Sequence, residues 1–357
     1  MQIFEAMAQE GHEQVTFFYD RATGLKLIVA VHDTTLGPAA GGCRLWHYDA
    51  EDDAIADALR LSRGMTLKNA VAGLDFGGSK CVVYGDPEKT PELLRGIGRF
   101  IETMGGRVNT GEDVGLTPED VEVMAETTRF IVGRKHKSGD PSKPAAYGTY
   151  MAVRAVLKET CGTPDPKGRR IVVQGAGNVG HELCRLLAAD GADLVISDIR
   201  PDRAKEVGEL YGARVVAPEA VTKEPGDVFS PCALGLVLTP EVARTIPVKA
   251  IAGSANNQLS DALVPAILKE RGVLYAPDFV VNGGGIINIS EEFHAEGYDK
   301  ERAYAKVARI YDRLLEIFEV ARREDITSEQ AAEHLALQRI EREGAQNGMF
   351  IPREARG

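Results

Sequence analysis

Hydrophobic residues in the first part of the chain form short runs that are separated by turn residues and by two segments with a helical period. The pattern predicts, in chain order, strands at 15–19 and 25–31, a helix at 51–63, strands at 70–73 and 81–84, and a helix at 91–104. Ala22-Thr23-Gly24 is typical of the turn of a β-hairpin, and Gly64 is placed to end the first helix.

Strands and helices alternate along the rest of the chain. Residues 133–144 are polar and rich in Lys, Gly, Ser and Pro, which predicts a linker. The pattern then predicts a helix at 147–158 and strands at 171–174, 194–197, 214–216, 227–230, 250–253 and 274–276, with helical segments between them. Apolar residues from Ala303 to Ala321 follow a single helical stripe. Such alternation favours a parallel sheet covered by helices.

Composition and charge exclude several classes of protein. Apolar residues make up 44% and charged residues 27% of the 357 residues, as in ordinary globular proteins. The formal net charge of −11 argues against binding to nucleic acid or to an anionic membrane. No apolar run is long enough to span a membrane, and residues 1–10 do not resemble a secretory signal.

The cysteines and histidines indicate neither disulfides nor a metal site. The five cysteines are widely spaced, with no Cys-x-x-Cys pair, and the seven histidines show no metal-ligand spacing. We therefore expect a reduced, cytoplasmic enzyme without a metal.

A dinucleotide-binding motif stands at the start of the second strand–helix alternation. Gly175-Ala176-Gly177-Asn178-Val179-Gly180 matches G-x-G-x-x-G, follows the strand at 171–174 and precedes a helical segment. In this context Gly175 allows a tight turn, Gly177 lets the backbone approach a pyrophosphate, and Gly180 lets helix and strand pack closely. Amide groups from Asn178 and Val179 onward would bind the phosphates at the helix N-terminus.

An acidic residue follows at the spacing that this motif requires. Asp198 ends the next predicted strand, where a carboxylate would accept hydrogen bonds from the adenine ribose and repel a 2′-phosphate. We therefore predict NAD as the cofactor. Arg200 lies two residues further on and leaves some use of NADP open.

Four glycine-containing segments of the first part each carry a charged side chain. They are 37–44, 64–70, 77–80 and 111–115, and they hold part of an unusually large number of glycines, 38 in all. We expect these glycines to let the backbone approach a small ligand. Two lysines and an aspartate suit an amino-acid substrate: one lysine pairs with its carboxylate, a second with a pKa lowered by burial beside a like charge acts as a base, and the aspartate handles the amine proton.

The motifs resemble those of the leucine, valine and phenylalanine dehydrogenases of the glutamate dehydrogenase superfamily. The matching runs extend over nearly the whole chain in the family order: GPAAGGCRLW (37–46), DALRLSRGMTLKNA (57–70), GEDVG (111–115), VVQGAGNVG (172–180), SPCALG (230–235), IAGSANNQL (251–259) and YAPDFVVNGGGIIN (275–288). The resemblance implies NAD-dependent, reversible oxidative deamination of an L-amino acid to a 2-oxo acid and ammonium.

The resemblance also implies roles for individual residues. Lys68 would bind the substrate carboxylate, and Lys80 would activate the water that attacks the imine. Asp113 would carry protons to and from the amine nitrogen, which the carbonyl of Gly41 would hold. The two catalytic residues are therefore expected to be Lys80 and Asp113.

Other positions concern the cofactor and the choice of substrate. Asn257 is favoured to steady substrate and nicotinamide, with Asn256 left as an alternative, and Cys232 is expected to pack near the cofactor. Ser79 replaces the third glycine that the family has before its catalytic lysine, and Ala40 stands where leucine-specific members often have leucine. If the position of Ser79 needs a positive φ angle or a close backbone approach, the serine would reshape the substrate pocket. A smaller Ala40 would widen the pocket.

The fold class that follows is α/β with two domains and an interdomain cleft. Residues 1–134, rejoined by 328–357, are predicted to form a substrate and oligomerisation domain, and 135–327 a Rossmann domain that binds NAD. We expect a homo-oligomeric enzyme acting on an apolar substrate of the leucine, valine and isoleucine class. The alternatives are a phenylalanine or tryptophan dehydrogenase, and a catalytically silent homologue that binds NAD or an amino acid.

Overall fold

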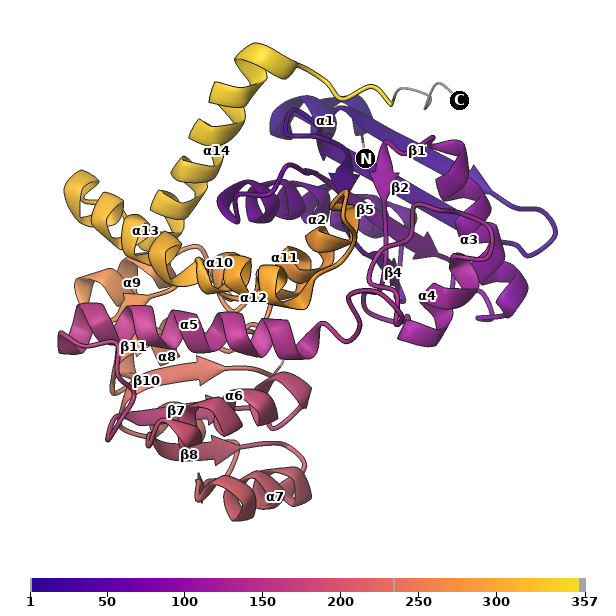
Figure 1. Ribbon diagram of the computed structural model, residues 1–357. Helices are drawn as coiled ribbons and strands as arrows, with labels where there is room; N and C mark the ends of the chain where they lie inside the picture. The colour runs from indigo at the N-terminus through magenta and orange to yellow at the C-terminus, as the bar shows by residue number, and fades with distance from the viewer. Residues whose placement is uncertain (1, 234, 353–357) are drawn as a thin grey trace. The chain divides into compact units, whose positions relative to one another are not determined.

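Two units of the chain are each built on a six-stranded sheet (Figure 1). The computed structural model describes residues 2–233 and 235–352. Unit 1 takes the residues up to Asp140, the segment Glu292–Tyr298 and the chain from Ala336 onward. Unit 2 takes Pro141–Glu291 and Asp299–Leu335.

Unit 1 has a mixed sheet in the order β1-β2-β5-β3-β6, with β4 also paired to β5. Its elements are α1 (Ile3–Glu10), β1 (Gln14–Tyr19), β2 (Lys26–Asp33), β3 (Ala39–Ala40), β4 (Cys43–Leu45), α2 (Glu51–Val71), β5 (Gly77–Tyr84), α3 (Pro91–Thr103), β6 (Val108–Asn109) and α4 (Pro118–Met124). Helix α2 lies on one side of β2 and β5, and α3 and α4 lie on the other (Figure 1). Apolar side chains of these helices pack against the two faces of the strands. The central strand β5 is therefore buried on both faces.

The structure confirms the hairpin at 15–31 and corrects two predictions around α2. The helix does not end at Gly64 but continues to Val71, so the strand predicted at 70–73 is wrong. The buried positions Thr66, Leu67 and Ala70 lie beyond Gly64, and their burial outweighs the cost of a glycine in the helix, about 1 kcal/mol. The strand predicted from residue 81 begins at Gly77.

Unit 2 has a fully parallel sheet in the order β9-β8-β7-β10-β11-β12. Its elements are α5 (Ser142–Cys161), β7 (Arg170–Gln174), α6 (Asn178–Ala189), β8 (Asp193–Ser197), α7 (Pro201–Tyr211), β9 (Arg214–Val215), η1 (Val221–Lys223), β10 (Gly226–Pro231), α8 (Pro240–Thr245), β11 (Val248–Ile251), α9 (Val264–Glu270), β12 (Leu274–Tyr275), α10 (Asp278–Val281), α11 (Gly284–Ser290), α12 (Lys300–Ala308) and α13 (Ile310–Glu324). The order reverses between β7 and β10, which is the Rossmann arrangement.

Two helical predictions in this unit need correction. Helix α5 begins at Ser142, inside the segment predicted as a linker. The apolar stripe from Ala303 to Ala321 belongs to two helices, because α12 ends at Ala308 and α13 begins at Ile310. An apolar stripe of this kind indicates which side of the helical residues faces the core, but it does not reveal a short break between two helices.

The unit boundaries differ from the predicted ones at three places. The first boundary falls after Asp140 rather than 134, and the C-terminal return begins at Ala336 rather than 328, inside α14 (Ser328–Asn347). Glu292–Tyr298 also joins unit 1, where a Glu292 carboxylate oxygen accepts hydrogen bonds from the amides of Gly133 and Ser138 at 3.2 Å each. In α14, Arg339 donates to the carbonyl of Leu74 at 2.6 Å.

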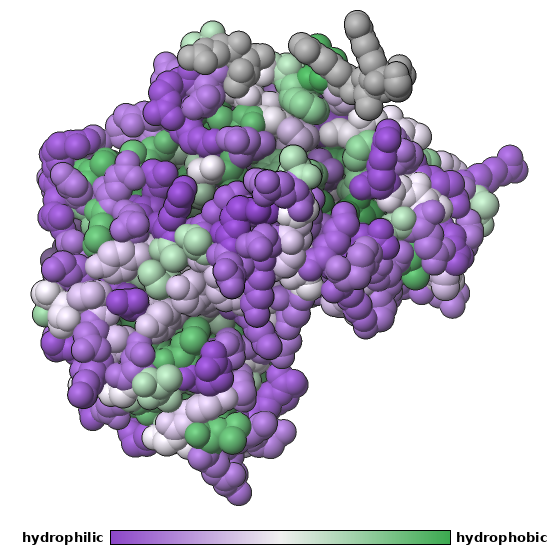
Figure 2. All heavy atoms as spheres, in the orientation of Figure 1, coloured by the Kyte–Doolittle hydropathy of each residue, from purple (hydrophilic) through white to green (hydrophobic). Residues whose placement is uncertain are grey.

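The surface in Figure 2 is largely hydrophilic, with small apolar patches, in keeping with the charge of −11. None of the helices within the described residues is long and apolar enough to cross a membrane. All five cysteines are free thiols. No group of three or more acidic, His or Cys side chains in the described part of the chain could hold a metal ion.

Candidate active site

Lys80 and Asp113 form an ion pair on the α2 side of the unit 1 sheet. The Nζ of Lys80 lies 2.9 Å from Oδ2 of Asp113, and the side chains are 5% and 23% exposed. Lys80 pairs with Ala30 across β2 and β5, and Ala30 packs in the apolar cluster under α2. The expected neighbour of this lysine was a like charge, whereas its ion-pair partner is a carboxylate.

The loop that carries Asp113 is held against β4 by backbone hydrogen bonds. The amide of Cys43 donates to the carbonyl of Gly111, and that of Leu45 donates to Val114, at 2.9 Å each. A side chain at Gly42 would place its Cβ 2.7 Å from the Cβ of Asp113. Glycine is therefore needed at position 42 so that two protein segments can touch.

The guanidinium of Arg44 completes this cluster, a role that the sequence alone does not predict. Arg44 of β4 donates from Nε to Oδ2 of Asp113 at 2.8 Å and from Nη1 to Oδ2 of Asp57 at 2.9 Å. The hydroxyl of Tyr48 donates to the same Asp57 oxygen at 2.7 Å. Arg44 belongs to the GPAAGGCRLW run, so the signal was present, but its contact with residues 57 and 113 depends on the tertiary fold.

The charges around Asp113 favour its ionised form. Burial raises the pKa of the Asp113 carboxyl, but the ammonium of Lys80 and the guanidinium of Arg44 outweigh burial and hold the pKa below its ordinary value. Asp113 is therefore a carboxylate near neutral pH and can accept a proton or a hydrogen bond from an amine.

The predicted substrate-binding residues lie on the same sheet face. Lys68 is half-buried near the end of α2, and Ala40 pairs with Gly78 in the sheet. Asn69, fully buried, donates from Nδ2 to the carbonyl of Gly77 at 2.7 Å, which fixes the end of α2 over β5. Gly41 lies so close to β5 that a Cβ there would meet a backbone oxygen at 1.7 Å.

Ser79 lies on the other face of the sheet. It pairs with Val31, whose side chain packs in the cluster on the α3 side, and its own side chain is 0% exposed. The φ angle of Ser79 is not positive. Because side chains alternate along a strand, Ser79 points away from the face that carries Lys80. The expectation that it reshapes the substrate pocket is therefore wrong, and Ala40 remains the position to examine.

In unit 2 the glycine-rich turn lies at the carboxyl end of β7, where the strand order reverses. Gly175 has a φ angle of 103°, and a Cβ at Gly180 would lie 1.9 Å from the Gly175 carbonyl oxygen. Space beside Gly177 is open, because a Cβ there would meet nothing within 4 Å. Helix α6 begins at Asn178 and Val179 without a side-chain cap. The open glycine and the uncapped amides fit a pyrophosphate.

Asp198 follows β8, as predicted, and also braces the turn. Its Oδ2 accepts a hydrogen bond from the amide of Ala176 at 2.7 Å, and Oδ1 accepts one from the amide of Arg200 at 2.8 Å. Each carboxylate oxygen has two lone pairs, so both retain capacity for a ribose hydroxyl. The guanidinium of Arg200 lies 4.0 Å from Oδ1.

Two loops from neighbouring strands lie at the same end of this sheet. Cys232 follows β10, donates its amide to Gln174 at 2.7 Å, and would lie 3.5 Å from a Cβ at Gly180. The asparagines follow β11: Asn256 accepts a hydrogen bond from Asn282 at 2.8 Å, whereas Asn257 is exposed with a φ angle of 51°. The side chain of Asn256 is thus held by a hydrogen bond within the protein, and Asn257 is the more available of the two for a ligand.

Substituting two glycines of this turn tests its geometry. We expect Gly180→Ala to lower the free energy of unfolding by about 1–3 kcal/mol, because its Cβ would clash with the Gly175 carbonyl. Gly177→Ala should keep the stability within about 0.5 kcal/mol and weaken NADH binding at least about tenfold, because its methyl occupies the open space. Urea unfolding and NADH fluorescence titration measure the two effects. Equal loss of stability in both variants would contradict this interpretation.

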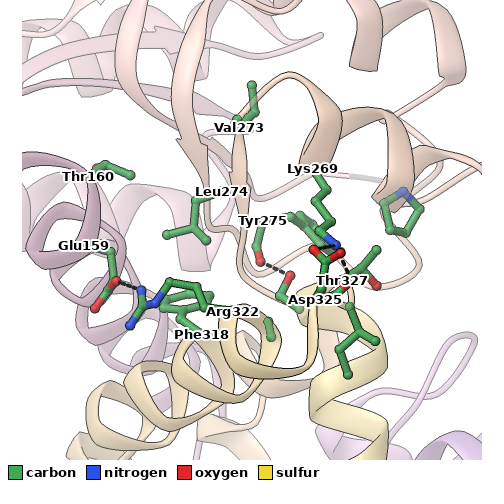
Figure 3. A pocket seen from close by; sticks show the side chains of 15 residues that line it. Glu159, Thr160, Lys269, Val273, Leu274, Tyr275, Phe318, Arg322, Asp325 and Thr327 are labelled. Carbon is green, nitrogen blue, oxygen red and sulfur yellow. Dashed lines mark hydrogen bonds and ion pairs between the residues drawn. The ribbon is translucent and has the colours of Figure 1, made fainter.

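A separate cavity of about 500 Å³ lies in unit 2 between α5, α9, β12 and α13. Figure 3 shows its apolar wall of Val273, Leu274 and Phe318, with the ion pairs Arg322–Glu159 and Lys269–Asp325 beside it. None of the predicted site residues lines this cavity. It is therefore distinct from the glycine-rich turn.

Comparison with known proteins matches most of the chain to one family. Residues 12–130 match the family model described as Glu/Leu/Phe/Val dehydrogenase, dimerisation domain, and residues 196–348 match that described as Glutamate/Leucine/Phenylalanine/Valine dehydrogenase. The leucine dehydrogenase of Thermoactinomyces intermedius is 44% identical over 346 residues, which cover 96% of this chain and 94% of that protein. The L-tryptophan dehydrogenase of Nostoc punctiforme is 43% identical, with 95% and 96% covered.

A solved structure shares the fold as well as the sequence. The crystal structure of L-tryptophan dehydrogenase from Nostoc punctiforme superposes with a TM-score of 0.87 and 41% sequence identity, and the match covers 96% of this chain and 100% of that chain. The similarity therefore extends through both units.

Proposed function

The chain belongs to the Glu/Leu/Phe/Val dehydrogenase family, and from this premise we propose that it is an NAD-dependent dehydrogenase of an apolar L-amino acid. The reaction converts the amino acid, NAD⁺ and water to the 2-oxo acid, ammonium, NADH and a proton, and it is reversible. The observation that carries the proposal is the ion pair between the buried Lys80 and the half-buried Asp113 on the side of the sheet that α2 covers. It supplies a base for water and a carboxylate for an amine on one face of unit 1.

The proposed roles of the unit 1 residues follow from their charges and positions. Lys68 binds the substrate carboxylate, and the carbonyl of Gly41 holds the amine. Asp113, ionised beside two cations, accepts a proton from the substrate nitrogen. Lys80 activates water for attack on the iminium carbon. The proton that leaves the water is then available to the departing ammonia.

Unit 2 carries the proposed cofactor site. When bound, NAD accepts the hydride that leaves the substrate Cα. The amides at the start of α6 and the open side of Gly177 bind the pyrophosphate, and Asp198 binds the adenine ribose. Cys232 packs at the cofactor, and Asn257 steadies the nicotinamide and the substrate. The carboxylate of Asp198 favours NAD over NADP because it repels a 2′-phosphate.

Two substrate classes are supported by different observations. The similarity to leucine dehydrogenase favours leucine, valine and isoleucine, which we take as the leading class. The small Ala40 and the similarity to the tryptophan dehydrogenase favour a phenylalanine or tryptophan substrate as the second candidate. A catalytically silent homologue would have no use for the intact Lys80–Asp113 pair.

A substrate panel distinguishes these functions. We expect kcat/KM for a branched-chain amino acid to exceed that for phenylalanine and tryptophan by at least about tenfold, which is what an apolar pocket can discriminate. NADP should support less than about a tenth of the NAD rate. Absorbance of the reduced cofactor measures both. A higher kcat/KM for the aromatic substrates would establish the second candidate, and NADH binding without turnover on any amino acid would establish the silent homologue.

We further propose a homo-oligomer in a reducing compartment such as the cytoplasm. Residues 12–130 match a model that is described as a dimerisation domain. Strand β1 pairs only with β2 within the described residues, and it exposes Phe17 and Tyr19 by 48% and 64%. An edge strand with exposed aromatic side chains is suited to pairing with another chain. The free thiols agree with a reducing compartment.

A further inference from the structure

Arg44 links the proposed catalytic carboxylate to helix α2. One guanidinium contacts two carboxylates, Asp113 through Nε and Asp57 through Nη1, and its side chain is 18% exposed. Asp57 lies on α2, whereas Asp113 lies in the loop after β6. Arg44 occupies β4 between Cys43 and Leu45, the two residues whose amides hold that loop, so its backbone is fixed on both sides.

The contacts with Asp113 all fall on one of its oxygens. Nε of Arg44 and Nζ of Lys80 both approach Oδ2, at 2.8 and 2.9 Å. Within residues 2–233 and 235–352, no side-chain hydrogen bond to Oδ1 is made. Two fixed cations on one oxygen hold the plane and the orientation of a carboxylate. The second oxygen is thereby left for a donor that is not part of the protein.

We propose that Arg44 is a positioning residue for the reaction: anchored to α2 through Asp57, it holds Asp113 as an oriented carboxylate whose Oδ1 receives the substrate nitrogen. The proposal deepens the proposed function and rests on it, because it assumes that Asp113 and Lys80 carry the chemistry. A lysine cannot replace the guanidinium of Arg44, because a single ammonium does not offer two donors in one plane at a fixed separation.

The anchor on α2 is itself charge-compensated and held. Oδ2 of Asp57 accepts hydrogen bonds from Tyr48 at 2.7 Å and from Arg44 at 2.9 Å, and Oδ1 accepts one from Arg60 at 2.6 Å. Asp57 is 15% exposed, whereas Arg60 is 56% exposed. Removing Arg44 therefore leaves Asp57 with two partners but takes from Asp113 one of its two cations.

The remaining titratable groups near Asp113 do not replace the guanidinium. The Cys43 thiol is fully buried, and burial raises its pKa well above the ordinary value, so it stays neutral. Glu112 is the exposed neighbour in sequence, and burial followed by the charge of Asp140 raises its pKa. Among the described residues, Lys80 is the only other cation that forms an ion pair with Asp113. Loss of Arg44 must therefore shift the titration of Asp113 to higher pH.

The test compares three arginine variants in the full-length enzyme. We expect Arg44→Gln to lower kcat/KM for the amino acid about 10- to 100-fold, because Asp113 loses a charged hydrogen bond. The acidic limb of the pH profile of kcat/KM should move to higher pH by about one unit for the same reason. Arg44→Lys should keep the acidic limb of the pH profile near that of the wild type but still lower kcat, because it restores the charge without the planar pair of donors. Arg60→Gln, which removes a guanidinium from Asp57 alone, should leave the profile unchanged.

Further measurements separate misfolding and failure of the parent proposal from failure of this one. NADH affinity and the unfolding midpoint should stay near wild-type values in Arg44→Lys, which keeps the proposal testable if Arg44→Gln folds poorly. If Lys80→Ala retains activity, the proposed function fails. If Lys80→Ala is inactive but both Arg44 variants have the wild-type pH profile and kcat, Arg44 has no positioning role. An equal shift of the profile in Arg60→Gln would likewise overturn it.

Discussion

Replacing Lys80 by alanine is expected to lower kcat by about 10²- to 10⁴-fold while NADH still binds. The side chain is 5% exposed and its ammonium lies 2.9 Å from Asp113, on the sheet face that α2 covers. Removing it takes away the group that, under the proposed function, accepts the proton of the attacking water. The residues proposed to bind the cofactor belong to unit 2 and are untouched, so the loss should appear in turnover rather than in NADH affinity.

The fold should survive this change, which makes the variant informative. Asp113 keeps its contact with Arg44 at 2.8 Å, so no uncompensated carboxylate is left in the site. Lys26→Ala is a matched control, because Lys26 lies on the neighbouring strand β2 and its side chain is exposed. Stopped-flow absorbance of NADH formation and a fluorescence titration measure the two quantities. Wild-type turnover in Lys80→Ala would refute the assigned base.

The Rossmann unit could be predicted from the sequence because its signals are local. Gly175, Gly177 and Gly180 follow a strand and open a helix, and Asp198 comes at the end of the next strand. Each feature depends on residues that lie within one strand–turn–helix segment. The order of β7 and β10, which puts Cys232 beside the glycine-rich turn, then follows from the reversal of a parallel sheet.

Unit 1 was harder to predict because its glycines act through tertiary contacts. Gly64 is typical of a helix end, yet α2 runs through it, since the burial of Thr66, Leu67 and Ala70 stabilises the following two turns. A Cβ at Gly41 would meet a backbone oxygen of Ser79, and one at Gly42 would meet Asp113, so both glycines allow segments of the protein to touch. A sequence shows that close approach occurs at such positions but does not show what approaches.

The missed residues share a physical cause. The contacts of Asp57 on α2 join it to Arg44 on β4 and to Tyr48 in the following loop. No sequence spacing predicts such a contact between a strand, a loop and a helix. Ser79 was overrated for the opposite reason. A serine in place of the third glycine before Lys80 suggests a reshaped pocket, but strand alternation directs the side chains of Ser79 and Lys80 to opposite faces.

Replacing Asp113 by asparagine is expected to lower kcat by about 10²- to 10³-fold at neutral pH. The amide cannot take a proton from the substrate nitrogen, although it keeps nearly the same shape and volume. The change also removes the shared counter-ion of Lys80 and Arg44, so we expect the free energy of unfolding at pH 7 to fall by about 2–4 kcal/mol.

The pH dependence of stability gives this variant a second readout. Lys80 and Arg44 hold the pKa of Asp113 below its ordinary value against the effect of burial, which raises it. The ionised carboxylate therefore stabilises the fold above the ordinary pKa near 3.8, and that stabilisation is lost as the pH falls through the lower pKa of the folded state. The stability difference between the wild type and Asp113→Asn should be constant near neutral pH and shrink below about pH 4.

The neighbouring residue provides the control for both effects. Glu112→Gln makes the same chemical change one position earlier, on an exposed side chain without an ion-pair partner within the described residues. It should leave kcat within about twofold and the unfolding free energy within about 0.5 kcal/mol. Urea unfolding between pH 3 and 8 measures the unfolding free energy of the two variants, and turnover assays at pH 7 to 10 measure their kcat. If Asp113→Asn turns over at the rate of Glu112→Gln, Asp113 does not handle the amine proton, and the site must take that proton elsewhere.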